Sequence, residues 1–269
     1  MKVAIYGKGG IGKSTIASNV SASCALCGKK VLQIGCDPKH DSTLLISNRE
    51  YPTVLDLIYN NPDITADDIV HEGKYGISCI EIGGPAPGVG CAGRGIIHGI
   101  EIIEKLGILK NNYDLTIYDI LGDVVCGGFF EPIKNKKADV MYVVTSGEFN
   151  SLFAANNLCA GYVNCGLKAK GLKFGGIIGN MRGIYHEEKI IKDFCDMVQV
   201  DLVELIPRSN DIENSTFMGV PVVERYKNSG VATVYQNIAQ KFLSETQPDY
   251  SPVPVKLAQL RDLILEAKQ

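Results

Sequence analysis

The chain has 269 residues, of which 45% are apolar and 21% charged, with 29 glycines and a formal net charge of −3. This balance is typical of a folded α/β protein with many tight turns, and the small negative charge argues against a dedicated nucleic-acid surface. No run of about 18 apolar residues is present, and the opening MKVAIYG is typical of a strand rather than a signal peptide. We therefore expect a cytoplasmic protein that binds neither nucleic acid nor membrane.

Apolar β-branched runs alternate with amphipathic stretches along the whole chain. The expected strands span residues 2–6, 29–36, 75–83, 113–120, 138–146, 172–180 and 200–207. The expected helices span residues 14–27, 53–59, 95–107, 129–136, 149–165, 186–198, 210–217 and 229–244. Strands separated by helices predict a mostly parallel sheet with helices on both faces. With no linker or repeat in sight, residues 1–269 are expected to form a single domain with a helical tail from about residue 253.

The first strand runs into a glycine-rich loop, GKGGIGKST at residues 7–15, which opens the first helix. The loop fits G-x-x-x-x-G-K-[ST], a strong signal for a phosphate-binding P-loop in this context. Lys13 would reach the β- and γ-phosphates, and Ser14 would bind Mg²⁺. The expected nucleotide-binding residues here are Gly7, Gly9, Gly10, Gly12, Lys13, Ser14 and Thr15.

Lys8 adds a second lysine directly after the first glycine of the loop. We expect its side chain to point away from its own phosphate cradle and to reach nucleotide on a facing subunit. There it would act as a catalytic residue, supplying charge to the transition state as an arginine finger does in trans. This interpretation predicts a face-to-face dimer; the alternative is a solvated surface lysine.

The second strand is followed by GCDPKHDST, which places Asp37 and Asp41 four residues apart with Lys39 between them. In an open α/β sheet, ligands gather at the carboxyl ends of the strands, where this loop and the P-loop both lie. We therefore expect Lys39 and Asp41 to contact nucleotide. Asp37 is a candidate for orienting the attacking water.

The fourth strand ends in YDILGD, in which Gly122 follows Asp119 by three residues. This D-x-x-G pattern is that of a Walker B and switch element. Asp119 would hold Mg²⁺ through water, and the N–H of Gly122 would sense the γ-phosphate. Asp123 is a second candidate for orienting the water, and the sequence does not choose between it and Asp37.

Two of the nine cysteines, Cys91 in GVGCAGRG and Cys126 in GDVVCGGF, stand in glycine-rich loops after the third and fourth strands. Bare backbone N–H groups and helix N-termini stabilise thiolates in such places. A four-iron cluster requires four cysteine thiolates, and an isologous dimer would supply two from each copy. The alternative is two unrelated cysteines. The other seven are expected to be buried packing residues: Cys24, Cys27, Cys36, Cys79, Cys159, Cys165 and Cys195.

The C-terminal tail carries one apolar helical face. Its members are Leu257, Leu260, Leu263 and Ile264. We expect this face to pack on the same chain or on a partner subunit. The alternative, a helix lying on a membrane surface, is weakened by Asp262 and Glu266 on the polar side.

Taken together, GKGGIGKST, GCDPKHDST, GGPAPGVGCAGRG and YDILGDVVCGGF resemble the nitrogenase iron protein family of P-loop NTPases. That family also includes the ATP-binding reductase subunits of dark-operative protochlorophyllide reductase and of nickel-tetrapyrrole reductive cyclisation. The resemblance covers essentially the whole chain. It implies a homodimer with two MgATP sites and one 4Fe–4S cluster held by Cys91 and Cys126 of both subunits.

The same resemblance implies roles for residues that the spacing alone does not explain. Asn180 in GNMR would contact adenine, with Pro207 and Arg208 of IPRS nearby. Arg94 would lie on the face that docks a partner protein. Asp123 would belong to the switch region along with the other loop aspartates.

The activity that the resemblance implies is ATP-gated electron transfer. MgATP hydrolysis would be coupled to single low-potential electrons that pass from the cluster to a separate catalytic nitrogenase-like complex, with ferredoxin or flavodoxin as donor. Two other interpretations are weighed against it. A positioning ATPase of the partition or septum-site type would need a basic face or a membrane helix but no cysteine pair. A carrier that donates iron–sulfur clusters would favour a closely spaced C-x-x-C.

Overall fold

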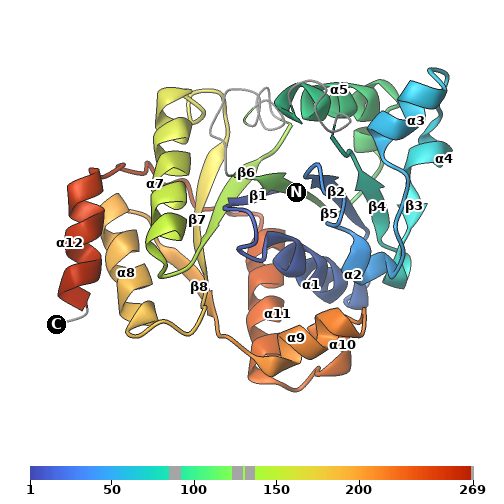
Figure 1. Cartoon of the computed structure of the whole chain (residues 1–269). Coiled ribbons are helices and arrows are strands. Elements are labelled where there is room, and N and C mark those ends of the chain that lie inside the picture. Colours follow the sequence, from blue (N-terminus) through green and yellow to red (C-terminus); the bar gives the residue numbers. More distant parts are fainter. Residues whose placement is uncertain (85–91, 123–129, 131–136, 268–269) are drawn as a thin grey trace.

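An eight-stranded sheet forms the centre of the protein, in the order β3-β4-β2-β5-β1-β6-β7-β8 (Figure 1). The computed structural model describes residues 1–84, 92–122, 130 and 137–267. All neighbouring strands pair in parallel except β3 and β4, which are antiparallel. The predicted fold class, a mostly parallel sheet, is therefore confirmed. The strands are β1 (Lys2–Gly7), β2 (Val31–Cys36), β3 (His71–Glu72), β4 (Ser78–Glu81), β5 (Leu115–Leu121), β6 (Val140–Thr145), β7 (Lys173–Asn180) and β8 (Leu202–Ile206).

Helices cover both faces of the sheet, as the alternation of elements predicts. On one face α1, α10 and α11 pack against the strands, and on the other lie α5, α7 and α8 (Figure 1). The expected helix at 129–136 lies, apart from residue 130, outside the described residues. The longer described helices are α1 (Lys13–Leu26), α3 (Val54–Asn60), α5 (Ala92–Lys105), α7 (Phe149–Asn164), α8 (Glu187–Val198), α9 (Asn210–Phe217), α11 (Gly230–Leu243) and α12 (Leu257–Ala267). Three single-turn helices were not predicted: α2 (Leu44–Ser47), α4 (Ala66–Ile69) and α10 (Val222–Arg225).

The strands bury side chains on both faces, which is why their sequences are nearly continuous apolar runs. In β1, Val3 and Ile5 join the core beneath α1 and α11, whereas Ala4 and Tyr6 join the core beneath α5 and α7. This alternation fixes the register of β1 between β5 and β6, because a slip of one residue would exchange the two sets. The P-loop therefore leaves β1 at a defined height on the sheet.

Two local expectations are wrong. The strand expected at 75–83 is confined to β4, because the backbone of Tyr75 turns through a left-handed conformation with φ 58°. Among the cysteines expected to be buried, Cys27 is exposed at the C-cap of α1 and Cys165 is only partly buried. Both follow the last turn of a helix, where side chains face solvent more readily than within it.

The C-terminal helix α12 packs on α7 and α8 of its own chain (Figure 1). Leu260 and Leu263 are buried, and Ile264 lies against the same core. The apolar face of the tail is therefore used within the chain, as expected. No helix in the described part of the chain is long and apolar enough to cross a membrane.

Candidate functional site

The P-loop turns sharply at Gly12 and opens α1. Gly12 has φ 100°, and a Cβ there would lie 2.5 Å from Nδ2 of Asn180, so both backbone conformation and space require glycine. Lys13 is buried, and its Nζ donates to the carbonyl oxygen of Lys8 at 3.3 Å. The side chain of Lys8 is partly buried. The backbone of the loop thus curves around the side chain of Lys13, as it does in a phosphate-binding loop.

Asp119 lies beside the P-loop at the end of β5, in register with Ile5 of β1. Its carboxyl is 1% exposed, and Oδ2 has no hydrogen-bond partner among the described residues. Burial raises the pKa of Asp119 above its ordinary value, whereas the charge of Lys13 and a hydrogen bond from Ser14 lower it. A buried, unpartnered carboxylate oxygen beside a P-loop serine fits an Mg²⁺ ion, which prefers hard oxygen ligands.

Gly122 packs directly on the first glycine of the P-loop. Its N–H donates to the carbonyl oxygen of Gly7 at 3.0 Å, and a Cβ on Gly122 would lie 2.8 Å from the backbone N of Gly7. The D-x-x-G element is therefore tied to the phosphate cradle through main chain, and the N–H expected to sense the γ-phosphate is instead engaged by Gly7 in this structure. Asp123 and Cys126 follow at once but lie outside the described residues.

Residues 37–43, here called the switch loop, connect β2 to α2. Asp37 is buried at its start, where Oδ1 accepts a hydrogen bond from the backbone of Lys39 at 3.0 Å. The charge of Asp37 adds to the rise in the pKa of Asp119, so the two carboxyls lie within electrostatic range of one another. Lys39 and Asp41 are exposed. The structure thus brings Asp37 near Asp119. Asp41 lines a cavity of about 360 Å³ together with Ser14 and Thr15 of the P-loop.

The residues expected around adenine line a cavity of about 180 Å³ beside the P-loop. Among those that line it are Gly12, Thr15, Asn180, Pro207 and Arg208. The side-chain amide of Asn180 donates to the carbonyl oxygen of Ile11 at 2.6 Å, so it fixes the P-loop from the base side.

Arg182 also belongs to this region but was not singled out in the sequence. Its guanidinium contacts the carbonyl oxygen of Gly10 in the P-loop, and Arg208 donates to the carbonyl oxygen of Arg182 at 3.2 Å. Its position two residues after Asn180 in GNMR was the available signal. The arginine places further positive charge beside the phosphate cradle.

Glu187 holds the loop that carries Arg182. This buried first residue of α8 accepts a hydrogen bond from the backbone N–H of Gly147 at 2.9 Å, and three more from residues 182, 183 and 184 at 2.8, 2.8 and 3.0 Å. One carboxylate thereby fixes the ends of two neighbouring strands, β6 and β7. No sequence pattern predicts this role, because an acidic residue at the start of a helix commonly lies in solvent and interacts with the helix dipole.

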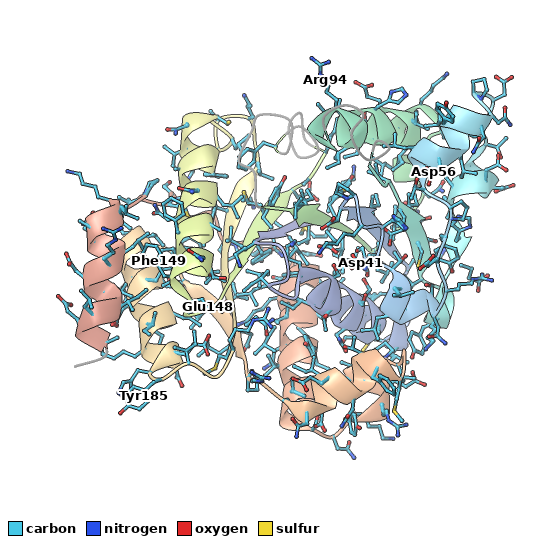
Figure 2. All side chains as sticks on the ribbon, in the orientation of Figure 1. Asp41, Asp56, Arg94, Glu148, Phe149 and Tyr185 are labelled. Atoms are coloured by element: carbon cyan, nitrogen blue, oxygen red, sulfur yellow. The ribbon has the colours of Figure 1, made fainter. Side chains whose placement is uncertain are left out.

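Arg94 is exposed in the first turn of α5 and projects away from the sheet (Figure 2). That position is free to meet a partner protein. Cys91, which the sequence predicts as a cluster ligand, precedes α5 and, like Cys126, lies outside the described residues. The strands that precede the two cysteines run in the same direction as β1, because β5 pairs in parallel with both β1 and β2, and β4 pairs in parallel with β2. β4 and β5 therefore end at the same end of the sheet as the P-loop.

Comparison with solved structures agrees with this architecture. A MinD cell division protein from Aquifex aeolicus superimposes with a TM-score of 0.67 at 22% identity, over 93% of this chain and 99% of that one. The MinD cell division ATPase of Pyrococcus furiosus gives a TM-score of 0.68 at 19% identity, over 89% and 96% of the two chains. At such identities the likeness shows the fold alone.

Sequence comparison goes further. The chain is 45% identical over 246 residues to nitrogenase iron protein 2 of Methanothermobacter thermautotrophicus, covering 91% of each protein. It is 42% identical to nitrogenase iron protein 2 of Paenibacillus durus, over 97% of this chain and 89% of that one. The family described as "4Fe-4S iron sulfur cluster binding proteins, NifH/frxC family" matches residues 1–269. The chain therefore belongs to the NifH/frxC family of 4Fe–4S cluster binding proteins, and the predicted cofactors, a 4Fe–4S cluster and MgATP, are those of this family.

Proposed function

We propose that the protein is the ATP-hydrolysing reductase component of a two-protein system. MgATP hydrolysis is coupled to the transfer of single low-potential electrons from a 4Fe–4S cluster to a separate nitrogenase-like catalytic complex. Cys91 and Cys126 of two identical subunits hold the cluster, which supplies the redox chemistry when bound. Reduced ferredoxin or flavodoxin is the proposed electron donor, and Arg94 lies on the proposed docking face.

The observation that carries this proposal is the short path from the nucleotide site to a cysteine loop. Asp119, which accepts a hydrogen bond from Ser14, and Gly122, whose N–H donates to Gly7, precede Cys126 by only seven and four residues in the sequence. A change at the phosphate end must therefore act close to that thiol, since seven residues span at most roughly 25 Å. The relatives named nitrogenase iron protein support the same assignment.

Within each subunit, the described residues divide the work at the nucleotide. Lys13 binds the phosphates, Ser14 and Asp119 hold Mg²⁺, and Asn180 fixes the loop next to the base. Lys8 is proposed to act on the nucleotide of the facing subunit. Asp37 and Asp123 remain the two candidates for orienting water.

Iron content tests the proposal directly. Protein purified without oxygen should be brown and contain about four irons per dimer. Cys91→Ala and Cys126→Ala should each lose the iron, whereas Cys27→Ala should keep it, because Cys27 is an exposed C-cap residue. Colourless, iron-free dimers after reconstitution would contradict the proposal. Cluster donation to an acceptor protein without any need for ATP would favour a carrier instead.

A further inference from the structure

Glu81 is a buried carboxylate at the end of β4 to which the proposed function gives no role. Its side chain is 1% exposed. Oε1 accepts hydrogen bonds from both the backbone N–H and the hydroxyl of Thr43, each at 2.6 Å, while Oε2 has no partner among the described residues. A buried carboxylate with half of its acceptors unused is costly, and the two hydrogen bonds from Thr43 offset part of that cost.

Through Thr43, Glu81 joins the switch loop to the strand that leads toward Cys91. Thr43 is the last residue of the switch loop. The beginning of the same loop also reaches this strand end, since a Cβ on Gly84 would lie 2.7 Å from Cβ of Pro38. The switch loop therefore meets the chain on both sides of Ile82, immediately before the segment that contains Cys91.

The opposite side of the switch loop is held by the P-loop helix. The hydroxyl of Ser18 in α1 donates to the carbonyl oxygen of Ser42 at 3.0 Å, and the amide of Gln33 donates to the same oxygen at 2.8 Å. All three side chains are buried. The end of the switch loop is thus clamped between the helix that begins at the phosphates and the strand that ends at Glu81.

The helix that follows the cysteine-bearing segment also packs on the residues after β4. In α5, which begins directly after Cys91, a Cβ on Gly99 would lie 2.4 Å from Cγ2 of Ile82. The described residues on either side of residues 85–91 are therefore Gly84, which lies beside the switch loop, and α5, which packs on Ile82. A displacement of the switch loop relative to β4 would act on Gly84, the last described residue before that segment.

We propose that Glu81 is a positioning residue that transmits the state of the switch loop to the segment bearing Cys91, through its two hydrogen bonds to Thr43. This rests on the proposed function, in which MgATP alters the surroundings of the cluster. Bound MgATP would then influence the cluster through Glu81 and the Cys91 segment as well as through Asp119 and Cys126. Both cysteine segments would respond to the same nucleotide. Such coupling requires that MgATP bind the two loop arrangements with different affinity.

The test uses the cluster-loaded homodimer and measures how fast a ferrous chelator removes iron, with and without MgATP. In the unaltered protein MgATP should accelerate iron removal. Glu81→Leu leaves both Thr43 donors buried without an acceptor, and the acceleration should fall about tenfold while MgATP still binds. Glu81→Gln should restore it, because an amide oxygen can accept both bonds.

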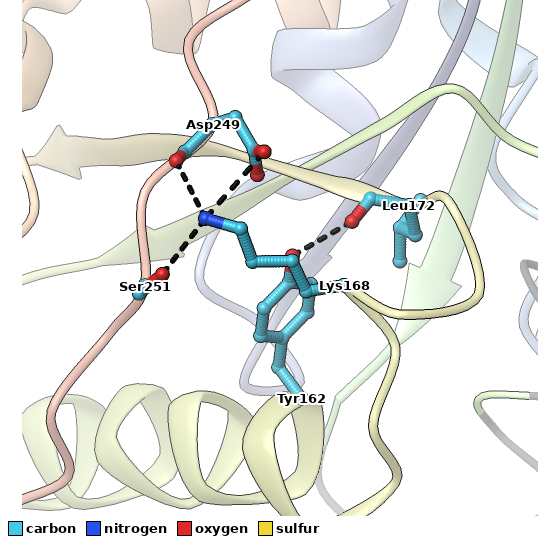
Figure 3. Close-up of polar contacts among 5 residues, drawn as sticks. All are labelled: Tyr162, Lys168, Leu172, Asp249 and Ser251. Carbon is cyan, nitrogen blue, oxygen red and sulfur yellow. Dashed lines mark hydrogen bonds and ion pairs between the residues drawn. The ribbon is translucent and has the colours of Figure 1, made fainter.

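Matched variants separate this role from a general loss of stability. Thr43→Val removes only the hydroxyl donor and should lose part of the response, whereas Thr43→Ser should keep it. Tyr162→Phe deletes a buried hydrogen bond in which the hydroxyl of this α7 residue donates to the carbonyl oxygen of Leu172 at 2.7 Å (Figure 3), and neither residue belongs to the switch loop. That variant should respond to MgATP as fully as the unaltered protein.

The outcomes distinguish the inference from the function on which it rests. If iron removal from the unaltered homodimer does not respond to MgATP, the proposed function itself fails. If that protein responds and Glu81→Leu responds equally, Glu81 has no positioning role. Should Glu81→Leu fail to hold its cluster, an undiminished response in Thr43→Val would overturn the inference in the same way.

Discussion

The two lysines of the P-loop differ in how far their side chains are exposed to solvent. Lys13 is buried and tied to the P-loop main chain, whereas Lys8 is partly exposed at the start of the same loop. A lysine that is already engaged within its own loop is placed to bind the phosphates of its own subunit. A lysine with part of its side chain in solvent can reach a second subunit.

Replacing Lys8 by Ala should therefore separate binding from turnover. MgATP should bind with nearly unchanged affinity, while hydrolysis at saturating MgATP should fall by roughly 10³-fold, the effect of removing a charge supplied in trans. Equilibrium binding and steady-state hydrolysis on the same preparation measure the two quantities. Equal losses in binding and turnover would show that Lys8 serves its own subunit.

Glu81 should make the nucleotide-free protein less stable as the pH rises. Burial raises its pKa to about 7, with Asp119 and Asp41 adding to the rise and hydrogen bonds from Thr43 opposing it. A carboxyl whose pKa is higher in the folded state stabilises the fold below its unfolded pKa, and this contribution is lost as the pH increases through about 7.

Urea unfolding of the nucleotide-free protein and of Glu81→Gln between pH 4 and 8 would measure this contribution. Relative to Glu81→Gln, the unaltered protein should lose on the order of 2 kcal/mol of unfolding free energy as the pH rises from 4 to 8. The amide variant does not titrate, so it supplies the baseline for all other groups. Parallel pH curves for the two proteins would show that Glu81 ionises freely in the folded state.

At the scale of single elements, the loop between β7 and α8 is held chiefly by Glu187. Glu187 takes four backbone hydrogen bonds, and the loop it fixes carries Arg182 to the P-loop. Glu187→Ala should leave these N–H groups without their acceptor, costing about 2–4 kcal/mol of unfolding free energy, and should weaken MgATP binding.

The matched control for Glu187 is Glu188, the next residue of α8, which is exposed and pairs with Lys192 at 2.6 Å. Glu188→Ala should change stability by less than about 0.5 kcal/mol. Thermal unfolding with and without MgATP would compare the two variants. If Glu187→Ala lost stability but kept the full stabilisation by MgATP, the loop would have no part in the nucleotide site.

How far the sequence could predict these elements depends on how local their causes are. The P-loop and D-x-x-G element are short patterns next to a strand, and the structure places both at one sheet edge. The bond from Asn180 to Ile11 joins residues 169 positions apart, so no local pattern could reveal it. Glu81 did leave a trace, a charge within the apolar run ISCIEI, but its partner Thr43 lies 38 positions away. The order of the strands in the sheet determines which loop lies next to a buried charged residue such as Glu81.

At the scale of the whole molecule, the C-terminal helix α12 contributes to the main hydrophobic core. Leu260 of α12 is fully buried in the core that also contains residues of α7 and α8. Leu260→Ala should therefore lower the unfolding free energy by about 2–5 kcal/mol. Leu265→Ala, on the exposed side of the same helix, should have little effect. Denaturant unfolding of the two variants measures the difference, and equal values would mean that α12 is not part of the cooperative unit.

The borders of the sheet restrict how two copies can meet. One border is β3, only two residues long and antiparallel. At the other, β8, Lys241 covers the carbonyl oxygen of Val203 and pairs with Glu204 at 3.1 Å. Short or charge-covered borders discourage strands of separate molecules from zipping together. Association by side-to-side extension of the sheet is thereby disfavoured, and the same protection guards a glycine-rich chain against fibrous aggregation.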